Sequence, residues 1–149
     1  MSILNLGTGN RIVPGAVNHD LTKHRPEISV THDLNVVPWP WADSSFDEIQ
    51  LISVAEHLKL TLIETLNECH RILKPGGKLV IKYPLWNGAN THKDPTHRWF
   101  WDVGVLDYVD PSTPAGKEYS YYTPHKWKIM EQGIIKQRNV KAVLNPRKI

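Results

Sequence analysis

Short runs of apolar residues, separated by polar and turn-forming segments, dominate the first 84 positions of the chain. Such runs occupy residues 3–6, 17–21, 28–34, 46–53 and 78–83, and glycine, proline, asparagine or aspartate lies between them. Short apolar runs bounded by turn residues are typical of buried strands in a parallel sheet. The pattern therefore predicts five strands in this part of the chain.

A helical pattern fills residues 62–73, between the fourth and fifth predicted strands. Leu62, Leu66 and Cys69 recur at helical spacing and form one apolar stripe. Thr61 and Glu64 fit a capping box at the start of this helix, and a Pro-Gly-Gly sequence follows its end. Strands joined through a helix predict an α/β fold with parallel neighbours.

The pattern is less regular beyond residue 84. Residues 103–109 predict a short helix, and residues 127–136 and 140–144 predict an antiparallel hairpin around a Gln-Arg-Asn turn. We therefore expect a Rossmann-like, doubly wound and mostly parallel sheet that ends in a C-terminal antiparallel hairpin. About ten residues, with Pro-Gly among them, separate the first two strands, so the first crossover helix should be largely missing.

Composition is that of an ordinary globular protein, with 40% hydrophobic and 22% charged residues in 149 positions. This length has room for one domain with a genuine core, and we expect residues 1–149 to form one. No apolar run approaches the roughly 18 residues of a membrane span, and no signal-peptide pattern begins the chain. Cys69 is the single cysteine, which fits a reducing compartment. These features predict a cytoplasmic protein without a membrane partner.

The net charge of +3 is unevenly distributed. Residues 1–84 hold 8 Lys/Arg against 9 Asp/Glu, whereas residues 85–149 hold 10 against 6 and four of the six tryptophans. A basic, aromatic surface suits an acidic or nucleotide-like partner, but a solvated basic surface over an aromatic core explains the same numbers. Nucleic-acid binding is therefore an open alternative.

Residues that suit a ligand follow three of the predicted strands. Gly7 and Gly9 follow the first strand, Asp20 ends the second and Asp33 ends the third. Ligands of doubly wound sheets bind beyond the carboxyl ends of the strands, where glycine lets them approach the backbone. Asp20 is placed to accept both hydroxyls of a ribose, and Asp33 to accept the amino group of an adenine. The alternatives are ordinary turn glycines and aspartates that serve as turn or cap residues.

Two common nucleotide-binding motifs do not match. A phosphate-binding P-loop needs Gly-Lys-Ser/Thr, which residues 9–12 lack. The dinucleotide fingerprint needs a third glycine where Ile12 stands, a helix where Pro14 stands, and a later acidic residue than Asp20. Without that helix no N-terminal dipole holds a pyrophosphate. A ligand with a ribose and a base but no phosphates fits better.

The order of the blocks carries a resemblance to a known family. The blocks are Leu-Asn-Leu-Gly-Thr-Gly at 4–9, Asn-His-Asp at 18–20, His-Asp-Leu-Asn at 32–35, Ser-Phe-Asp-Glu-Ile at 45–49 and Leu-Lys-Pro-Gly-Gly at 73–77. Together they resemble the class I S-adenosylmethionine-dependent methyltransferases, especially small bacterial and phage-type members. A Glu-His pair at 56–57 and Asp-Pro-Thr-His-Arg at 94–98 are similar to further blocks of such proteins. The sequence departs from the family at Asn5, which replaces an acidic residue, and in lacking the third glycine of the loop.

The resemblance implies S-adenosylmethionine as cofactor, bound by a core of residues 3–84, with residues 85–149 forming the substrate side and closing hairpin. Gly7 and Gly9 would border the methionine part of the cofactor, Asp20 would bind the ribose, and Asp33 would flank the adenine. Ser53 would lie under the methionine or sulfonium. The full implied cofactor-binding set is Asn5, Gly7, Gly9, Asp20, Leu21, Asp33, Leu34 and Ser53.

Methyl transfer needs an aligned acceptor and, for a hydroxyl or amide, a group that takes its proton. The candidate catalytic residues are His57, His97 and Asp94, although His57 could equally serve in packing at a helix entry. His92, Asp94 and His97 could act as a base, as a metal site or as loop structure. Their spacing matches no strong metal signature, so we expect no metal.

The activity has alternatives as well. The leading prediction is a methyltransferase whose acceptor the sequence does not identify. The alternatives are a module that binds S-adenosylmethionine without catalysis and a nucleic-acid-associated protein with the methyltransferase fold. A homodimer through exposed aromatic residues or the closing hairpin is a further expectation.

Overall fold

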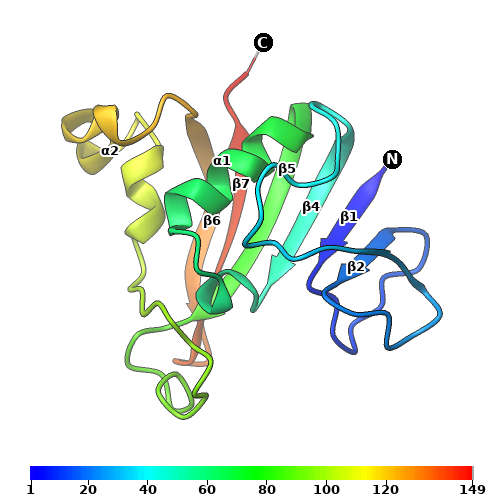
Figure 1. The fold of residues 1–149 in the computed structure, drawn as a ribbon. Coiled ribbons are helices and arrows are strands. Elements are labelled where there is room, and N and C mark those ends of the chain that lie inside the picture. Colours follow the sequence, from blue (N-terminus) through cyan, green and yellow to red (C-terminus); the bar gives the residue numbers. More distant parts are fainter. Residues whose placement is uncertain (149) are drawn as a thin grey trace.

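The computed structural model describes residues 1–148 and contains one seven-stranded sheet (Figure 1). Its strands are β1 (Ile3–Leu6), β2 (Val17–Asp20), β3 (Ile28–Thr31), β4 (Phe46–Ile52), β5 (Leu73–Pro84), β6 (Trp127–Ile135) and β7 (Asn139–Pro146). Two α-helices and three 3₁₀ helices join them: η1 (Ala55–His57), α1 (Leu62–Ile72), η2 (Val105–Val109), α2 (Pro114–Glu118) and η3 (Ser120–Tyr122). The strand order is β3-β2-β1-β4-β5-β7-β6.

The predicted fold class is confirmed. Strands β1 to β5 pair in parallel, and β7 pairs antiparallel with both β5 and β6, so that the closing hairpin extends the sheet. α1 ends one residue earlier than predicted, and the capping box of Thr61 and Glu64 is present at its start. α2 and η3 were not predicted, because their segment is rich in turn residues and shows no apolar periodicity.

The fifth strand begins earlier than its apolar run. The apolar run predicts a start at residue 78, but pairing of Leu73 with Phe46 extends β5 back to the end of α1. Pro75 and Gly76 therefore lie inside the strand, at a register shift next to its pairing with β4. The difference arises from pairing with a distant strand, which local apolar periodicity does not report.

Three of the parallel connections contain no helix. Residues 7–16, 21–27 and 32–45 form turns and extended segments, which confirms that the first crossover helix is missing. Among the described residues, α1 is the main helix that packs on the sheet, and it crosses one face of it (Figure 1). The opposite face carries polar side chains such as Gln50, Lys82 and Lys141, as expected for a face without helices above it.

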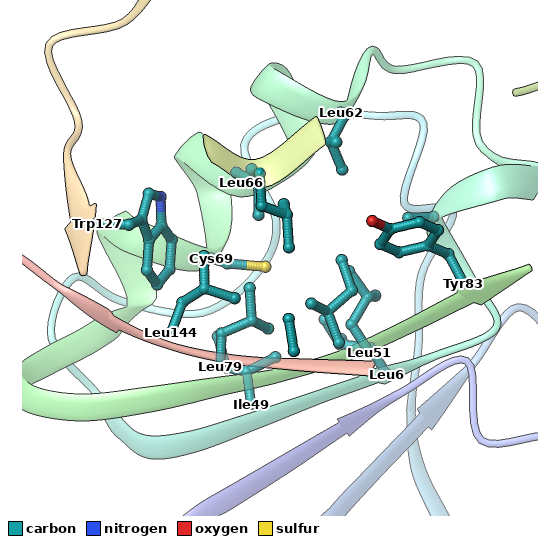
Figure 2. Close-up of a cluster of buried hydrophobic side chains, with 14 of the residues drawn as sticks. Leu6, Ile49, Leu51, Leu62, Leu66, Cys69, Leu79, Tyr83, Trp127 and Leu144 are labelled. Atoms are coloured by element: carbon teal, nitrogen blue, oxygen red, sulfur yellow. The ribbon is translucent and has the colours of Figure 1, made fainter. Parts of the chain in front are cut away.

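The core lies between α1 and the covered face of the sheet. Leu66 and Cys69 of α1 point toward Ile49, Leu51 and Leu79 of the central strands, and all five are at most 1% exposed (Figure 2). Burial of each such leucine or isoleucine contributes about 1.5–3 kcal/mol to stability. The helix therefore holds β4 and β5 in place, and with them the loops that follow these strands.

The topology positions the ends of several strands at one edge. β1 lies between β2 and β4, so successive connections run to opposite sides of β1. Ligands of open α/β sheets bind at such a switch point, beyond the carboxyl ends of the strands. None of the helices within residues 1–148 is both long enough and apolar enough to cross a membrane.

Candidate functional site

Two neighbouring clefts open at this edge of the sheet. The first, here called the strand-end cleft, has a volume of about 340 Å³. Its lining residues are Gly7, Gly9, His19, Asp20, Leu21, His32, Asp33, Leu34, Asn35, Ser53, Val54, His57 and Leu58. The second, here called the loop cleft, has a volume of about 300 Å³ and is lined by Ser53, Glu56, His57, Pro84, Asn90, Thr91, Asp94, His97, Arg138 and Asn139.

Gly7 and Gly9 form the floor of the strand-end cleft with left-handed backbone, at φ of 58° and 55°. A Cβ atom at Gly7 would lie only 2.5 Å from Cγ2 of Val54, whereas a Cβ at Gly9 would meet nothing within 4 Å. Gly7 is therefore required for the close approach of β1 to the segment after β4. Gly9 keeps the cleft open instead.

His19 supports this floor from β2. The amide of Gly7 donates to Nδ1 of His19 at 3.1 Å, so the ring proton lies on Nε2, which donates to the carbonyl of His32 at 2.8 Å. Burial lowers the pKa of His19 and keeps the ring neutral. Sequence reasoning missed His19, although its place directly before Asp20 in a buried strand is a signal that could have found it.

Asp20 presents its carboxylate at the end of β2. Oδ2 accepts from the amide of Gly9 at 2.7 Å and contacts Nε2 of His24 at 3.1 Å, and Oδ1 accepts from the amide of Leu21 at 2.8 Å. Burial alone would raise the pKa of Asp20, but these hydrogen bonds lower it overall. The carboxylate is thus ionised near neutral pH and keeps lone-pair capacity for a ligand hydroxyl.

Asp33, Leu34 and Asn35 form the far wall, just after β3. Oδ1 of Asp33 accepts from the amide of Asn35 at 2.9 Å, which leaves Oδ2 for a ligand. The side chain of Leu34 is buried at 5% exposure, and Leu21 lies at the rim with 62% exposure. Apart from Asn5, all the predicted cofactor-binding residues line the strand-end cleft.

Asn5 has a different place in the structure. Its side chain is fully buried and donates to the carbonyl of Arg11 at 2.8 Å and to Oδ1 of Asn18 at 3.0 Å, while Arg11 donates to its Oδ1 at 2.6 Å. The amide thereby fastens the helix-free link between β1 and β2. Asn5 is not among the residues that line the strand-end cleft.

The charge of the strand-end cleft limits what it can bind. Its titratable lining residues are two aspartates and three histidines, and its lining includes no lysine or arginine from the described residues. A phosphate group needs cationic or helix N-terminal donors, which this cleft does not offer. A ligand with hydroxyl, amino or cationic groups suits it better.

Ser53 and His57 line both clefts and so mark where these meet. Ser53 follows β4 with φ of 58°, a left-handed conformation that is uncommon for a residue other than glycine. The chain then turns into η1, which places Glu56 and His57 beside the cleft junction. The arrangement lets a ligand in one cleft contact a ligand in the other.

Glu56 is the most unusual residue of the loop cleft. Its side chain is only 1% exposed, and its Oε1 has no hydrogen-bond partner among the described residues. Burial raises the pKa of Glu56 to about 7. Its Oε2 lies 3.8 Å from Nε2 of His57 and 3.9 Å from Nε2 of His97.

The two histidines are held in defined orientations. The hydroxyl of Thr96 lies 2.6 Å from Oδ1 of Asp94, to which it donates, and it therefore accepts from Nδ1 of His57 at 2.8 Å. Nδ1 of His97 donates to the carbonyl of Thr91 at 2.7 Å. In its neutral form each ring thus carries its proton on Nδ1 and keeps a lone pair on Nε2, the ring nitrogen nearer to Oε2 of Glu56. Burial, followed by the charge of His97, lowers the pKa of His57.

The structure brings the three predicted catalytic residues together but separates them from His92. Oδ2 of Asp94 lies 3.5 Å from Nε2 of His97, and the rings of His57 and His97 are 4.8 Å apart. His92 instead contacts the carbonyl of Trp86 at 2.7 Å, stacks on Phe100 and lines neither cleft.

Sequence reasoning missed Glu56 as a functional residue. The signal that could have found it is a carboxylate next to a histidine within the mostly apolar segment 51–60.

Comparison with known proteins agrees with this architecture. The family described as "Methyltransferase domain" matches residues 8–81. An S-adenosylmethionine-dependent methyltransferase of Archaeoglobus fulgidus is 15% identical with a TM-score of 0.65, over 97% of this chain and 85% of that one. The Haloferax volcanii protein solved in complex with the Trm112 methyltransferase activator is 15% identical with a TM-score of 0.69, over 99% and 82%. An S-adenosylmethionine-dependent methyltransferase of Aquifex aeolicus is 14% identical with a TM-score of 0.61, over 97% and 81%. No curated protein sequence matches the chain at a significant level.

Proposed function

Because the chain belongs to the class I S-adenosylmethionine-dependent methyltransferases, we propose that it transfers a methyl group to an acceptor bound in the loop cleft. The observation that carries the proposal is that Ser53 and His57 line both clefts. A cofactor in the strand-end cleft and an acceptor in the loop cleft would therefore meet at these two residues. Methyl transfer requires such an in-line approach.

The strand-end cleft fits the cofactor in its chemistry. Asp20 would accept the ribose hydroxyls, Asp33 would accept the adenine amino group, and Leu34 would contact the adenine ring. Gly7 and Gly9 would let the methionine part approach the backbone. The aspartates, and a lining to which residues 1–148 contribute no lysine or arginine, suit a ligand that carries a cation and no phosphate.

The residues of the loop cleft would prepare the acceptor. The bound cofactor supplies a methyl group on an already activated sulfonium, so the protein needs little covalent chemistry. His57 would accept the proton of the acceptor at Nε2, because Thr96 holds its Nδ1 and Asp94 orients Thr96. His97 and Asp94 would form a second proton-accepting pair beside His57.

The lining of the loop cleft also favours a class of acceptor. Asn90, Asn139 and Arg138 surround the histidines and offer hydrogen bonds to a polar molecule. An acceptor with a hydroxyl or N–H group needs the proton acceptor that His57 provides. We therefore propose a polar acceptor that is methylated on oxygen or nitrogen.

Calorimetric titration with S-adenosylmethionine and S-adenosylhomocysteine tests cofactor binding. Asp20→Asn and Asp33→Asn should each weaken binding of both ligands at least tenfold, because a carboxylate acceptor is lost in each. Glu27→Gln is the matched control: Glu27 is an exposed acidic residue before β3, outside the lining. Absence of binding at millimolar ligand would refute the proposal.

Transfer of a labelled methyl group separates catalysis from binding alone. The protein is incubated with methyl-labelled S-adenosylmethionine and with small-molecule, protein and nucleic-acid fractions of a cell extract. Label in one fraction identifies the acceptor class, and label in nucleic acid would support the nucleic-acid alternative. Binding without transfer to any fraction would favour a non-catalytic binding module.

A further inference from the structure

Three side chains with metal-ligating atoms converge in the loop cleft, from η1 and from the loop after β5. Oε2 of Glu56 lies 3.8 Å and 3.9 Å from the Nε2 atoms of His57 and His97, and one ligand atom of each residue lies within 4.8 Å of the others. Ligands that share an ion at about 2.1 Å lie roughly 3–3.5 Å apart. Side-chain movements of about 1 Å would therefore bring all three to a common ion.

The hydrogen bonds around the histidines prepare them as ligands. Nδ1 of His57 is held by Thr96, and Nδ1 of His97 is held by the carbonyl of Thr91. Metal-ligating histidines commonly donate their other ring N–H to such a partner, which fixes the tautomer and the ring orientation. Both Nε2 atoms consequently lie within 4 Å of the same oxygen, Oε2 of Glu56.

Glu56 supplies an independent observation that points to a cation. Its carboxyl group is 1% exposed, its Oε1 has no partner among residues 1–148, and Oε2 lies beyond hydrogen-bond range of both histidines. A buried carboxylate oxygen without a hydrogen bond is destabilising unless a cation or proton compensates its charge. Packing alone does not explain a glutamate at this position, since an apolar residue would avoid that cost.

We infer that Glu56, His57 and His97 form a binding site for one first-row divalent transition-metal ion. Two imidazoles and one carboxylate are ligands that suit zinc, manganese, iron or cobalt, whereas magnesium and calcium prefer all-oxygen sites. Three protein ligands on one side leave a coordination position that faces the loop cleft. This site differs from the one that sequence spacing suggests, because Glu56 and His57 take the places of His92 and Asp94 beside His97.

Metal binding does not depend on the proposed methyl transfer, and it would change how the acceptor is prepared. The ion would occupy the lone pair by which His57 accepts a proton, and would itself lower the pKa of an acceptor hydroxyl. The three side chains would thus have two alternative states. In the metal-free state His57 accepts the proton directly, and in the metal-bound state the ion assists. If methyl transfer persists in the presence of a chelator, the metal-free state is the one that catalyses it.

Titration of metal-free protein with Zn²⁺ tests the site without cofactor or acceptor. We expect one equivalent to bind, and Glu56→Gln and His97→Asn each to weaken that binding at least tenfold. His92→Gln is the matched control, because His92 lies on the same loop outside the cluster, and it should bind as the wild type does. Millimolar Mg²⁺ should not displace the Zn²⁺. Absent binding, or equal binding by all four proteins, overturns the inference.

NMR spectra of the histidine ring nitrogens in the wild-type protein provide a second test, which does not depend on whether a variant folds. On titration with Zn²⁺, the Nε2 signals of His57 and His97 should shift together at one equivalent, while those of buried His19 remain. Shifts confined to other histidines would refute the site. A wild-type protein that binds S-adenosylhomocysteine but not Zn²⁺ refutes the metal site alone, and a wild-type protein that binds Zn²⁺ but not S-adenosylhomocysteine refutes the proposed function alone.

Discussion

At the scale of single residues, Gly7 and Gly9 share a left-handed backbone but have different surroundings. Gly7 lies against Val54, whereas the space beside Gly9 is open. A side chain at either position bears the cost of the left-handed conformation, roughly 1–2 kcal/mol. At Gly7 it also collides with Val54, which lies between Ser53 and η1.

Gly7→Ala should therefore destabilise the protein more than Gly9→Ala. We expect about 1–2 kcal/mol for Gly9→Ala, and about 1–3 kcal/mol more for Gly7→Ala because of the contact with Val54. Urea denaturation measures both. Adding Val54→Ala should bring the cost of Gly7→Ala close to that of Gly9→Ala, and equal costs in the wild-type background would show that Val54 is not the obstacle.

His70 makes a residue-scale contribution that depends on pH. It is 6% exposed, it contacts the carbonyl of Lys126 through Nε2 at 3.0 Å, and its ring lies against Trp127. Burial, followed by neighbouring His125 and Lys148, lowers the pKa of His70 to about 4. The unfolded chain, with a pKa near 6.5, binds the proton more readily than the folded one between these values.

The contribution of His70 to the free energy of unfolding is thus fully present above pH 6.5, and it is lost as the pH falls from 6.5 toward 4. Between pH 7 and pH 5 the free energy of unfolding should drop by about 1–2 kcal/mol through this group. In His70→Gln, which keeps a donor for the carbonyl of Lys126, that part of the pH dependence should disappear. Parallel pH profiles of the two proteins in urea denaturation would argue against the assignment.

At the scale of elements, α1 links the core to the site. Its apolar stripe packs on β4 and β5, and the chain enters it directly from η1 through residues 58–61. The capping box fixes where the helix begins, since Thr61 accepts from the amide of Glu64 at 3.2 Å and Glu64 accepts from the amide of Thr61 at 3.1 Å. The position of Glu56 and His57 depends on this start.

Thr61→Ala should lower the free energy of unfolding by about 1 kcal/mol, because an amide at the helix start loses its acceptor. Thr61→Ser keeps the hydroxyl and should differ from the wild type by only about 0.3 kcal/mol. Urea denaturation of the three proteins provides the comparison. A serine variant as unstable as the alanine variant would assign the effect to packing of the threonine methyl group.

At the scale of the whole molecule, the sheet is covered by helix on one face, and both clefts lie at its carboxyl edge. The loop after β5 closes the loop cleft by returning to η1: the amide of Arg98 donates to the carbonyl of Glu56 at 2.8 Å, and the indole of Trp99 donates to the carbonyl of Leu58 at 2.7 Å. Ligand binding at this edge therefore connects segments from both parts of the chain. The homodimer and nucleic-acid partners stay predictions.

Binding of S-adenosylhomocysteine to the folded protein should raise its overall stability. At a free ligand concentration of one hundred times Kd, the gain is about 2.7 kcal/mol, which corresponds to a rise in Tm of roughly 5–10 °C. Thermal denaturation with and without ligand measures it, and at the same ligand concentration Asp20→Asn should show a smaller rise. An unchanged Tm at saturating ligand would contradict binding to the native state.

Much of the fold could be predicted because its signals are local. Each strand from β1 to β4 lies within one apolar run bounded by turn residues, and α1 carries its own stripe and capping box. The start of β5 could not be predicted, because Leu73 joins the strand only by pairing with Phe46. α2 and η3 could not be predicted either, because their short segments show no periodicity and are held by contacts with η2.

The sequence by itself determined where Gly7, Gly9, Asp20 and Asp33 lie, and all four line the strand-end cleft, whereas Asn5 does not and His19 was missed. These four residues end or follow strands that must end at one edge of a parallel sheet, so their order in the chain already implies their proximity. The sequence also indicated His57, Asp94 and His97, but only the tertiary structure decided that they converge with Glu56 in the loop cleft. His97 reaches Glu56 across 41 positions through backbone contacts of an irregular loop, and the isolation of the Glu56 carboxylate exists only once the core has formed around it. Such burial is a property of the packed molecule, and no local pattern encodes it.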